Sequence, residues 1–347
     1  MPSNYKVGIA GASGYTGSEL LRLLIHHPNA TIQSITSERL AGQHVTDVFP
    51  QLSGTIDLTF QSMDKLDAGS LDILFLALPH GVSMGFLKET QAHEQCTVID
   101  LSGDFRLETA EEYRRWYGKE HVIPELLEKA VYGLTELFRD QVANARLIAN
   151  PGCYPTSSIL PLYPLLEAGA VKPDSIIVDA KSGVTGAGAK PKERTHFPTV
   201  NDNFLAYGLK SHRHTPEIGM ALNRSGKATT NVLFTPHLLP INRGILSTTY
   251  SRPVKTMTAD DPLKILKDRY DHETFIRVRT RPPEIRDVRG SNFADVYATY
   301  DERTDTVITV SCIDNLVKGA AGQAVQNMNC RLGLNESTGL LHLPLTP

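Results

Sequence analysis

The chain has little cysteine and no concentration of positive charge. Its four cysteines form neither a CxxC pair nor a disulfide framework: Cys96, Cys153, Cys312 and Cys330. Lys and Arg number 35 against 38 Asp and Glu, and the formal net charge is −3 without any Lys/Arg block. We therefore do not expect a nucleic-acid partner.

Long apolar runs, internal repeats and low-complexity tracts are also missing. No stretch approaches the ~20 apolar residues that span a bilayer, and residues 1–6 lack the apolar region of a signal peptide. Hydrophobic residues make up 41% and charged residues 21%, values that are ordinary for a globular protein. We expect a cytoplasmic protein without membrane contact. Its 347 residues are long for one core, so two domains are expected.

Strand-like and helix-like segments alternate in the first part of the chain. Strands are expected at residues 6–10, 31–36, 71–78, 97–101 and 146–150. A helix is expected at 17–27, ended by Pro28. This alternation predicts parallel βαβ units in a doubly wound α/β sheet.

After about residue 150 strands dominate. They are expected at 175–181, 231–235, 244–251, 274–280, 294–300 and 306–313. In several of these strands polar and apolar residues alternate. This alternation predicts an α+β domain whose antiparallel or mixed sheet has one face exposed to solvent. A helix from 315 to about 330 is expected to return to the first domain. The predicted domains are 1–150 with 315–347, and 151–314.

Glycines at positions 11, 14 and 17 form a G-x-x-G-x-x-G pattern between the first expected strand and helix. Glycine lets the backbone approach a pyrophosphate, whose charge is attracted by free N–H groups at a helix start. The pattern indicates a nucleotide-binding loop, although a glycine-rich turn without a ligand has the same signature. The candidate cofactor contacts here are Gly11, Ser13, Gly14, Tyr15, Thr16 and Gly17.

The second expected strand ends about 20 residues beyond this loop, where dinucleotide sites choose between their two cofactors. A carboxylate there suits the ribose 2′-hydroxyl of NAD, and an Arg suits the 2′-phosphate of NADP. Glu38 leaves the choice ambiguous, but Ser37 and Arg39 together favour NADP(H), with Arg39 as the charge partner. The alternative is that Arg39 is a solvated surface residue.

Cys153 follows the expected strand at 146–150 and precedes Pro155, a residue typical of the first turn of a helix. A thiol near a helix N-terminus becomes a better nucleophile, because the helix favours its negative charge. Cysteine is more often a small buried hydrophobe, which is what we expect of Cys96 and Cys312. Pro161 and Pro164 are expected to kink or end the helix.

A dense polar cluster lies at residues 212–218. An imidazole from His212 or His214 is the natural acid/base partner of a thiol, and Glu217 could fix its tautomer. His214 is slightly preferred. A histidine-rich surface turn is the main alternative. A metal site needs at least a third ligand, and the sequence nominates none, so no metal is expected.

Several motifs occur in order through nearly the whole chain: 11–17, 100–106, 132–136, 150–156, 182–188, 212–218, 234–238 and 314–323. Together they resemble the N-acetyl-γ-glutamyl-phosphate reductase family of arginine biosynthesis, in its longer bacterial type within the semialdehyde dehydrogenase group. Thr135 departs from the resemblance, because the family often has Pro there; the departure touches a turn. The resemblance implies a Rossmann NADP-binding domain and a catalytic domain that also mediates oligomerisation.

The resemblance implies reduction of N-acetyl-L-glutamyl 5-phosphate by NADPH to N-acetyl-L-glutamate 5-semialdehyde and phosphate. Cys153 would be the nucleophile that carries the acyl group as a thioester, and His212 and His214 would supply acid/base help. Arg106 and Asn150 are the candidate substrate ligands. Further cofactor contacts are expected at Pro79, Ser182, Gly183 and Asn315, the last two near the nicotinamide.

Three other functions are considered. The first is the same chemistry on an aminoadipyl phosphate of lysine biosynthesis. The second is a nucleotide-sensing regulatory protein with a dead site, which would be expected to lack the thiol or the histidines. The third is a thiol acyltransferase without a nicotinamide. A homo-oligomer, dimer or tetramer, is expected because such assemblies are common.

Overall fold

The computed structural model describes residues 4–226 and 229–345. The chain divides into two compact units, each with its own sheet. Unit 1 comprises Met1–Pro151 with Ala320–Leu341, and unit 2 comprises Gly152–Gly319 with His342–Pro347. Residues 315–319 and the last described residues, expected with the first domain, therefore lie in unit 2. The side chain of Asn315 links the start of the 315–319 segment to unit 2 through hydrogen bonds to Gly244 and Thr185.

Unit 1 contains a six-stranded parallel sheet in the order β2-β1-β3-β4-β6-β5. The strands are β1 (Tyr5–Ala10), β2 (Ala30–Thr36), β3 (Ile73–Leu76), β4 (Thr97–Asp100), β5 (Val131–Tyr132) and β6 (Leu147–Ala149). The doubly wound order confirms the expected fold class, and the reversal beside β1 is where such sheets bind ligands. The short edge strand β5 was not expected.

Seven α-helices lie in the described part of unit 1. They are α1 (Tyr15–Leu24), α2 (Val45–Val48), α3 (Val82–Thr90), α4 (Ala92–Gln95), α5 (Ala110–Tyr117), α6 (Thr135–Asn144) and α11 (Gly322–Arg331). Helix α1 ends before the expected residue 27, because a residue that precedes a proline disfavours helical geometry. α1 packs against α11, which also packs against α6.

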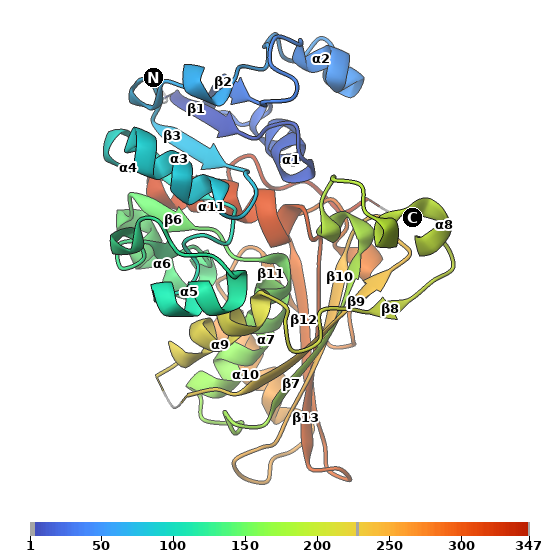
Figure 1. Cartoon of the computed structure of the whole chain (residues 1–347). Helices are drawn as coiled ribbons and strands as arrows, with labels where there is room; N and C mark the ends of the chain where they lie inside the picture. The colour runs from blue at the N-terminus through green and yellow to red at the C-terminus, as the bar shows by residue number, and fades with distance from the viewer. Residues whose placement is uncertain (1–3, 227–228, 346–347) are drawn as a thin grey trace. The chain divides into compact units, whose positions relative to one another are not determined.

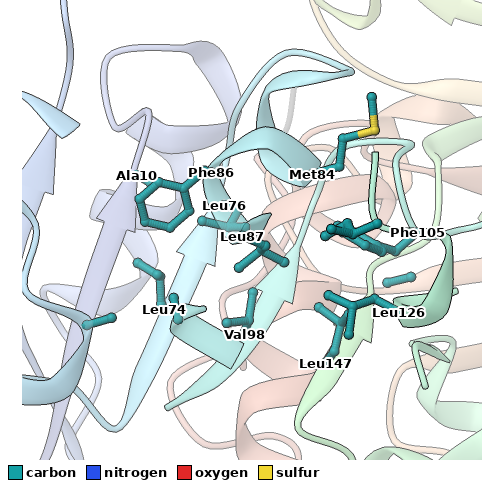
Figure 2. Close-up of a cluster of buried hydrophobic side chains, with 14 of the residues drawn as sticks. Ala10, Leu74, Leu76, Met84, Phe86, Leu87, Val98, Phe105, Leu126 and Leu147 are labelled. Carbon is teal, nitrogen blue, oxygen red and sulfur yellow. The ribbon is translucent and has the colours of Figure 1, made fainter. Parts of the chain in front are cut away.

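The alternating side chains of the strands build the core of unit 1. On one face, Leu74, Leu76, Val98 and Leu147 pack with side chains from α3 and the segments that follow β4. Figure 2 shows this cluster, with Phe105 beside the labelled leucines. Both faces of a parallel sheet are covered in its centre, and the four residues of β3 are accordingly apolar and all buried. The edge strand β2 is partly exposed and carries polar residues.

Helix α11 is buried along its whole length and carries amide side chains that bind the rest of unit 1. Asn327 donates to the Gly133 carbonyl at 2.8 Å and to Asn150 Oδ1 at 3.0 Å. Thr135 Oγ1 donates to Asn327 Oδ1 at 2.6 Å and accepts from Gln323 at 2.9 Å. A proline at position 135 could make neither contact, so the departure from the family pattern here adds a buried polar link.

Unit 2 contains a seven-stranded mixed sheet in the order β11-β12-β13-β10-β7-β9-β8. The strands are β7 (Ile176–Gly183), β8 (Leu205–Ala206), β9 (Val232–Leu239), β10 (Ile245–Ser251), β11 (Ile276–Val278), β12 (Ala294–Asp301) and β13 (Thr306–Ile313). Only the pairs β7–β9 and β11–β12 are parallel. This confirms the expected mixed sheet, and β9 runs on through Pro236 beyond its expected end.

The helices of unit 2 are α7 (Cys153–Glu167), α8 (Phe197–Val200), α9 (His214–Asn223) and α10 (Asp261–Tyr270). α7 packs on β10 and β13, α10 on β12, and α9 on β9 and α7 (Figure 1). Along β7, β9 and β10 buried residues alternate with half-exposed ones. One face of the sheet is therefore covered by helices, and the other carries exposed apolar side chains such as Ile177 and Leu233.

Helix α7 continues through Pro161 and Pro164, contrary to the expectation that they would kink or end it. A proline removes the hydrogen bond to the carbonyl four residues earlier. The two carbonyls left without that bond are those of Ser157 and Leu160. The Ser311 hydroxyl of β13 donates to the Ser157 carbonyl, and the Tyr270 hydroxyl of α10 donates to the Leu160 carbonyl at 2.6 Å. Neighbouring elements thus replace both missing donors.

Replacing Tyr270 by Phe tests this account. The substitution leaves the buried Leu160 carbonyl without a donor, which costs about 1–3 kcal/mol of unfolding free energy. Urea denaturation followed by circular dichroism gives that value. Tyr300→Phe is a matched control, since Tyr300 donates to the Asp305 side chain in a loop. Equal losses in the two variants would contradict the proposed role of Tyr270.

Candidate active site

The thiol of Cys153 lies at the first residue of α7 and is partly exposed. The preceding N-cap is Gly152, which has no side chain to cap the helix, and no acidic residue occurs in the first turn. The positive end of the helix is therefore left to act on the thiol. By contrast Cys96, Cys312 and Cys330 are buried, and burial raises the pKa of Cys96 and Cys330 to about 11. Only Cys153 among the four has the position of a nucleophile.

Glu217 connects the start of α7 to the histidine cluster. Its side chain is fully buried, and Oε1 accepts a hydrogen bond from the Gly152 amide at 2.7 Å. Oε2 lies 3.9 Å from His214 Nε2, one turn earlier on α9. The i, i+3 spacing of the helix places both residues on one face. The carboxylate thus fixes the backbone next to Cys153 and faces the imidazole.

The two histidines lie together and beside Tyr154, the residue after Cys153. The ring centroids of His212 and His214 are 4.9 Å apart, and Tyr154 packs edge-on against both, at 5.6 Å and 6.0 Å. The His214 amide donates to His212 Nδ1 at 3.2 Å, so that nitrogen is the unprotonated one of a neutral ring. The cluster is therefore a packed part of unit 2 and not a surface turn.

The two imidazoles differ in environment. Burial, with a smaller contribution from the Arg213 charge, lowers the pKa of His212 from 6.5 to about 4. His212 is consequently neutral at pH 7 and positions the start of α9 through its Nδ1. His214, which faces the Glu217 carboxylate, is the better placed of the two for proton transfer.

Two tyrosines that the sequence did not single out complete this cluster. Tyr207 donates to the Tyr154 hydroxyl at 3.1 Å, and Tyr154 donates to the His237 carbonyl at 2.8 Å. Burial raises the pKa of Tyr207 to about 12 and that of Tyr154 further, so both keep their protons at neutral pH. The position of Tyr154 directly after Cys153 in the sequence could have identified it as a site residue. Tyr207 lies in a loop, and no sequence pattern identified it.

Three expected cofactor contacts of unit 2 form one backbone junction. Gly183 donates its amide to Gly244, whose own amide donates to Asn315 Oδ1 at 2.7 Å. A Cβ at Gly183 would lie 2.8 Å from the Asn242 carbonyl oxygen, so only glycine fits there. Buried Ser182 donates to the Gly183 carbonyl at 3.0 Å. These contacts define structural roles for Ser182, Gly183 and Asn315, and their contact with a cofactor stays a prediction.

The glycine loop of unit 1 fits a dinucleotide. Gly11 has a φ of +85°, a conformation that favours glycine. Helix α1 begins after Gly14, with no side-chain cap and no acidic residue in its first turn. The first amides of a helix lack intrahelical partners, so this end offers donors to an anion. A Cβ at Gly17 would clash with the backbone of Gly11 and Ala12, so this glycine permits the tight turn.

The residues after β2 favour a cofactor with a 2′-phosphate. The Glu38 carboxylate accepts a hydrogen bond from the Met63 amide at 2.8 Å and is thereby engaged within unit 1. Ser37 is buried and shares a 2.8 Å hydrogen bond with Ser13 of the glycine loop. Arg39 is exposed, as is Pro79 after β3. A hydrogen bond thus joins Ser13 to Ser37, and the Arg39 side chain is exposed to solvent.

The side chains of the two expected substrate ligands of unit 1 form hydrogen bonds with backbone carbonyls. Arg106 is only 6% exposed; its Nε donates to the Asn150 carbonyl and its Nη2 to the Leu101 carbonyl, both at 2.8 Å. The Asn150 side chain donates through Nδ2 to the Ala320 carbonyl at 3.0 Å, and its Oδ1 accepts from Asn327. These contacts define structural roles, and substrate binding by either residue stays a prediction.

The motif at residues 100–106 organises the ends of β3 and β4. Asp104 accepts hydrogen bonds from the amides of Gly81 and Met84, so it caps the start of α3. Asp100, fully buried, accepts from Ser102. Burial, together with the nearby Asp104 charge, raises the pKa of Asp100 to about 7. The two carboxylates therefore stabilise the loops at the sheet edge.

Comparisons with known proteins find one family model in each of the two structural units. Residues 6–145 match the family model "Semialdehyde dehydrogenase, NAD binding domain", and residues 153–315 match "Semialdehyde dehydrogenase, dimerisation domain". The N-acetyl-gamma-glutamyl-phosphate reductase of Citrifermentans bemidjiense is 49% identical over 99% of both chains. That of Magnetococcus marinus is 47% identical over 100% of both chains. The chain belongs to the N-acetyl-gamma-glutamyl-phosphate reductases of the semialdehyde dehydrogenase family.

Solved structures of more distant relatives have the same fold. The aspartate semialdehyde dehydrogenase II of Vibrio cholerae superposes with a TM-score of 0.74 at 18% identity, covering 95% of this chain and 99% of that one. The aspartate semialdehyde dehydrogenase of Candida albicans, solved with NADP, gives 0.68 at 19% identity over 94% and 98%. The curated relatives confirm the family resemblance that the sequence motifs indicated. The solved structures show only that the fold is shared.

Among residues 4–226 and 229–345, no group of three or more His, Cys, Asp or Glu side chains is placed to hold a metal ion. None of the helices within these ranges combines the length and the apolar character needed to cross a membrane.

The partly buried His212 predicts a pH dependence of stability. The pKa of His212 is lowered on folding from 6.5 to about 4. Between these values the unfolded chain binds a proton that the folded chain does not, so stability falls as the pH decreases through this range. In the His212→Asn variant the side-chain oxygen of Asn can still accept from the His214 amide. Asn does not titrate, so the pH-dependent contribution to stability is lost.

We expect the free energy of unfolding of the wild type, relative to His212→Asn, to fall by at most about 3 kcal/mol between neutral pH and pH ~4. Urea titrations across this interval measure it, with His26→Asn at an exposed position as the control. A difference between wild type and His212→Asn that does not change with pH would refute the lowered pKa of His212.

Proposed function

We propose that this chain reduces N-acetyl-L-glutamyl 5-phosphate with NADPH to N-acetyl-L-glutamate 5-semialdehyde and phosphate, through a thioester on Cys153. One observation carries the proposal: Cys153 begins a helix without a side-chain cap, next to a buried Glu217 that faces His214. The chain has this arrangement while matching N-acetyl-gamma-glutamyl-phosphate reductases over its full length.

The thiolate of Cys153 attacks the carbonyl carbon of the acyl phosphate. The new S–C bond forms, the C–O bond to phosphate breaks, and inorganic phosphate leaves with the electron pair. The N-terminus of α7 favours the thiolate before attack. After attack, backbone amides of the first turn, such as that of Cys153, are the donors for the oxygen of the tetrahedral adduct.

NADPH, when bound, supplies the hydride that the acyl group requires. The glycine loop, with Ser13, would hold the diphosphate, and Ser37 with Arg39 would hold the 2′-phosphate. Pro79 in unit 1, and Ser182, Gly183 and Asn315 in unit 2, are further proposed contacts. The engagement of Glu38 Oε1 with the Met63 amide supports NADP(H), because this carboxylate oxygen already has a partner within unit 1.

His214 is the proposed acid and base. It holds a proton that passes to the departing sulfur when the aldehyde leaves, and it takes that proton back in the reverse direction. Glu217 orients the ring and compensates its positive charge. His212 keeps the start of α9 in place through the His214 amide. Arg106 and Asn150 remain the proposed substrate ligands of unit 1.

Nothing in the described residues favours the aminoadipyl alternative, and the relatives named above are reductases of the glutamyl compound. A dead regulatory site is not favoured, since thiol, imidazole and carboxylate are all present and adjacent. A homo-oligomer, dimer or tetramer, is part of the proposal, and the half-exposed face of the unit 2 sheet is a suitable surface; sedimentation velocity decides it. The four cysteines form no disulfide, which is compatible with a reducing cytoplasm.

Cys153→Ser tests the covalent step. A serine hydroxyl is a far weaker nucleophile than a thiolate, so we expect turnover to fall by at least about a thousandfold while NADPH binding is unchanged. The reaction is followed as NADPH formation from N-acetylglutamate semialdehyde and phosphate, with the aminoadipate semialdehyde as competitor. Cys330→Ser, which alters a buried thiol on α11, is the control. Substantial reductase activity in Cys153→Ser would exclude the thioester.

Arg39→Ala tests the cofactor assignment. A charge-assisted hydrogen bond to a phosphate contributes about 1.5–3 kcal/mol, so NADPH should bind roughly 10- to 100-fold more weakly. NADH binding should not change, because NADH has no 2′-phosphate. Fluorescence titration with both cofactors measures the two affinities, and Lys88→Ala, which removes an exposed charge from α3, is the control. An unaltered NADPH affinity in Arg39→Ala excludes this role.

A further inference from the structure

A single π-helical turn lies against the thiol-bearing residue. The turn comprises Val317–Ala321 and precedes α11 directly. At its centre the Gly319 amide donates to the Asp314 carbonyl at 2.9 Å, five residues back. Single π turns are rare and occur frequently at functional sites, because the extra residue widens the helix and displaces its backbone. Here the displaced backbone meets Cys153.

The contact between Gly319 and Cys153 leaves no room for a side chain. A Cβ added at Gly319 would lie 2.7 Å from Cys153 Cβ and 3.1 Å from Cys153 Cα. On its other side it would lie 3.2 Å from Ile313 Cδ1. The Cys153 atoms belong to or are bonded to the backbone, so no rotation of a flexible side chain can relieve the overlap. The start of α7 itself would have to move.

The π turn is fixed from several directions, so it is the start of α7 that would yield. Asp314 is fully buried, and its Oδ1 accepts from the amides of Leu316 and Val317 at 2.8 Å and 3.1 Å. Its Oδ2 accepts from the Gly290 amide at 2.7 Å and faces Arg243. The Lys318 side chain is also buried, with Nζ 5.7 Å from the centre of the Phe275 ring.

We propose that Gly319 is a positioning residue for the Cys153 nucleophile: the absence of a side chain on the π turn allows the thiol to occupy the first position of α7. This inference rests on the proposed function, since it assigns the contact a role in the chemistry of Cys153. The Gly152 amide, which binds Glu217, is the immediate neighbour of the residue that would be displaced. A displaced start of α7 would therefore change both the helix field at the sulfur and the contact with Glu217.

The first experiment compares Gly319→Ala with Gly85→Ala. Gly85 lies in α3 with no atom within 4 Å of its Cβ position, so an added methyl group is accommodated. Alkylation of Cys153 by iodoacetamide is measured against pH by mass spectrometry of the Cys153 peptide. In Gly319→Ala the midpoint of the profile should rise by at least half a pH unit and kcat should fall at least tenfold. NADPH affinity should stay within twofold of the wild type.

The Gly85→Ala protein should match the wild type in all three measurements. An alkylation profile in Gly319→Ala identical to that of the wild type would overturn the proposal, even if kcat fell. Alkylation reports on the sulfur whether or not it carries the acyl group. Failure of the proposed function, seen as full activity of Cys153→Ser, is thus distinguishable from failure of this inference.

A double-mutant cycle covers the case in which Gly319→Ala does not fold. Cys153→Gly removes the Cβ that an alanine at position 319 would strike. Gly319→Ala should therefore lower the Tm less in the Cys153→Gly background than in the wild type. If Gly319→Ala folds only in that background, the contact is supported. An equal decrease in both backgrounds, or no folding in either, places the requirement for glycine elsewhere and overturns the proposal.

Discussion

The structure of unit 2 depends on how the start of helix α7 is held. A helix that contains Pro161 and Pro164 has two carbonyls without their usual partners, and the hydroxyls of Ser311 and Tyr270 supply the missing donors. At its first turn the Gly152 amide binds a buried carboxylate from α9. The helix packs on β10, β13 and α9, and its first turn places Cys153 next to Tyr154, which contacts the two histidines of the same unit.

The motif residues divide into those that present chemistry and those that hold the backbone. Cys153, His214 and the glycine loop offer a nucleophile, an imidazole and free amides. Asp104 caps α3, and Arg106 donates to the Asn150 carbonyl, so both charged side chains hold the backbone of unit 1. A buried charged group must be paired or hydrogen-bonded. For this reason a charged residue in a motif is as readily a support for a loop as a ligand for a substrate.

Much of the local structure could be predicted from the sequence, because it arises from short-range patterns. Alternating apolar segments located β1, β2 and β13 closely, and the glycine spacing located the loop before α1. Pro155 and the preceding strand placed Cys153 at a helix start. The prediction for Pro161 and Pro164 was wrong because the donors that rescue α7 come from residues more than a hundred positions away. No local pattern contains that information.

The sequence by itself determined the two kinds of sheet, the family, and the thiol and glycine loop as candidate sites, since each depends on residue type and spacing. Only the tertiary structure decided that desolvation lowers the pKa of His212, that residues 315–319 belong to unit 2, and that Gly319 lies against Cys153. Those properties depend on desolvation and on close packing between segments far apart in the chain. Both are set by the neighbours of a residue in space, which its neighbours in sequence do not specify.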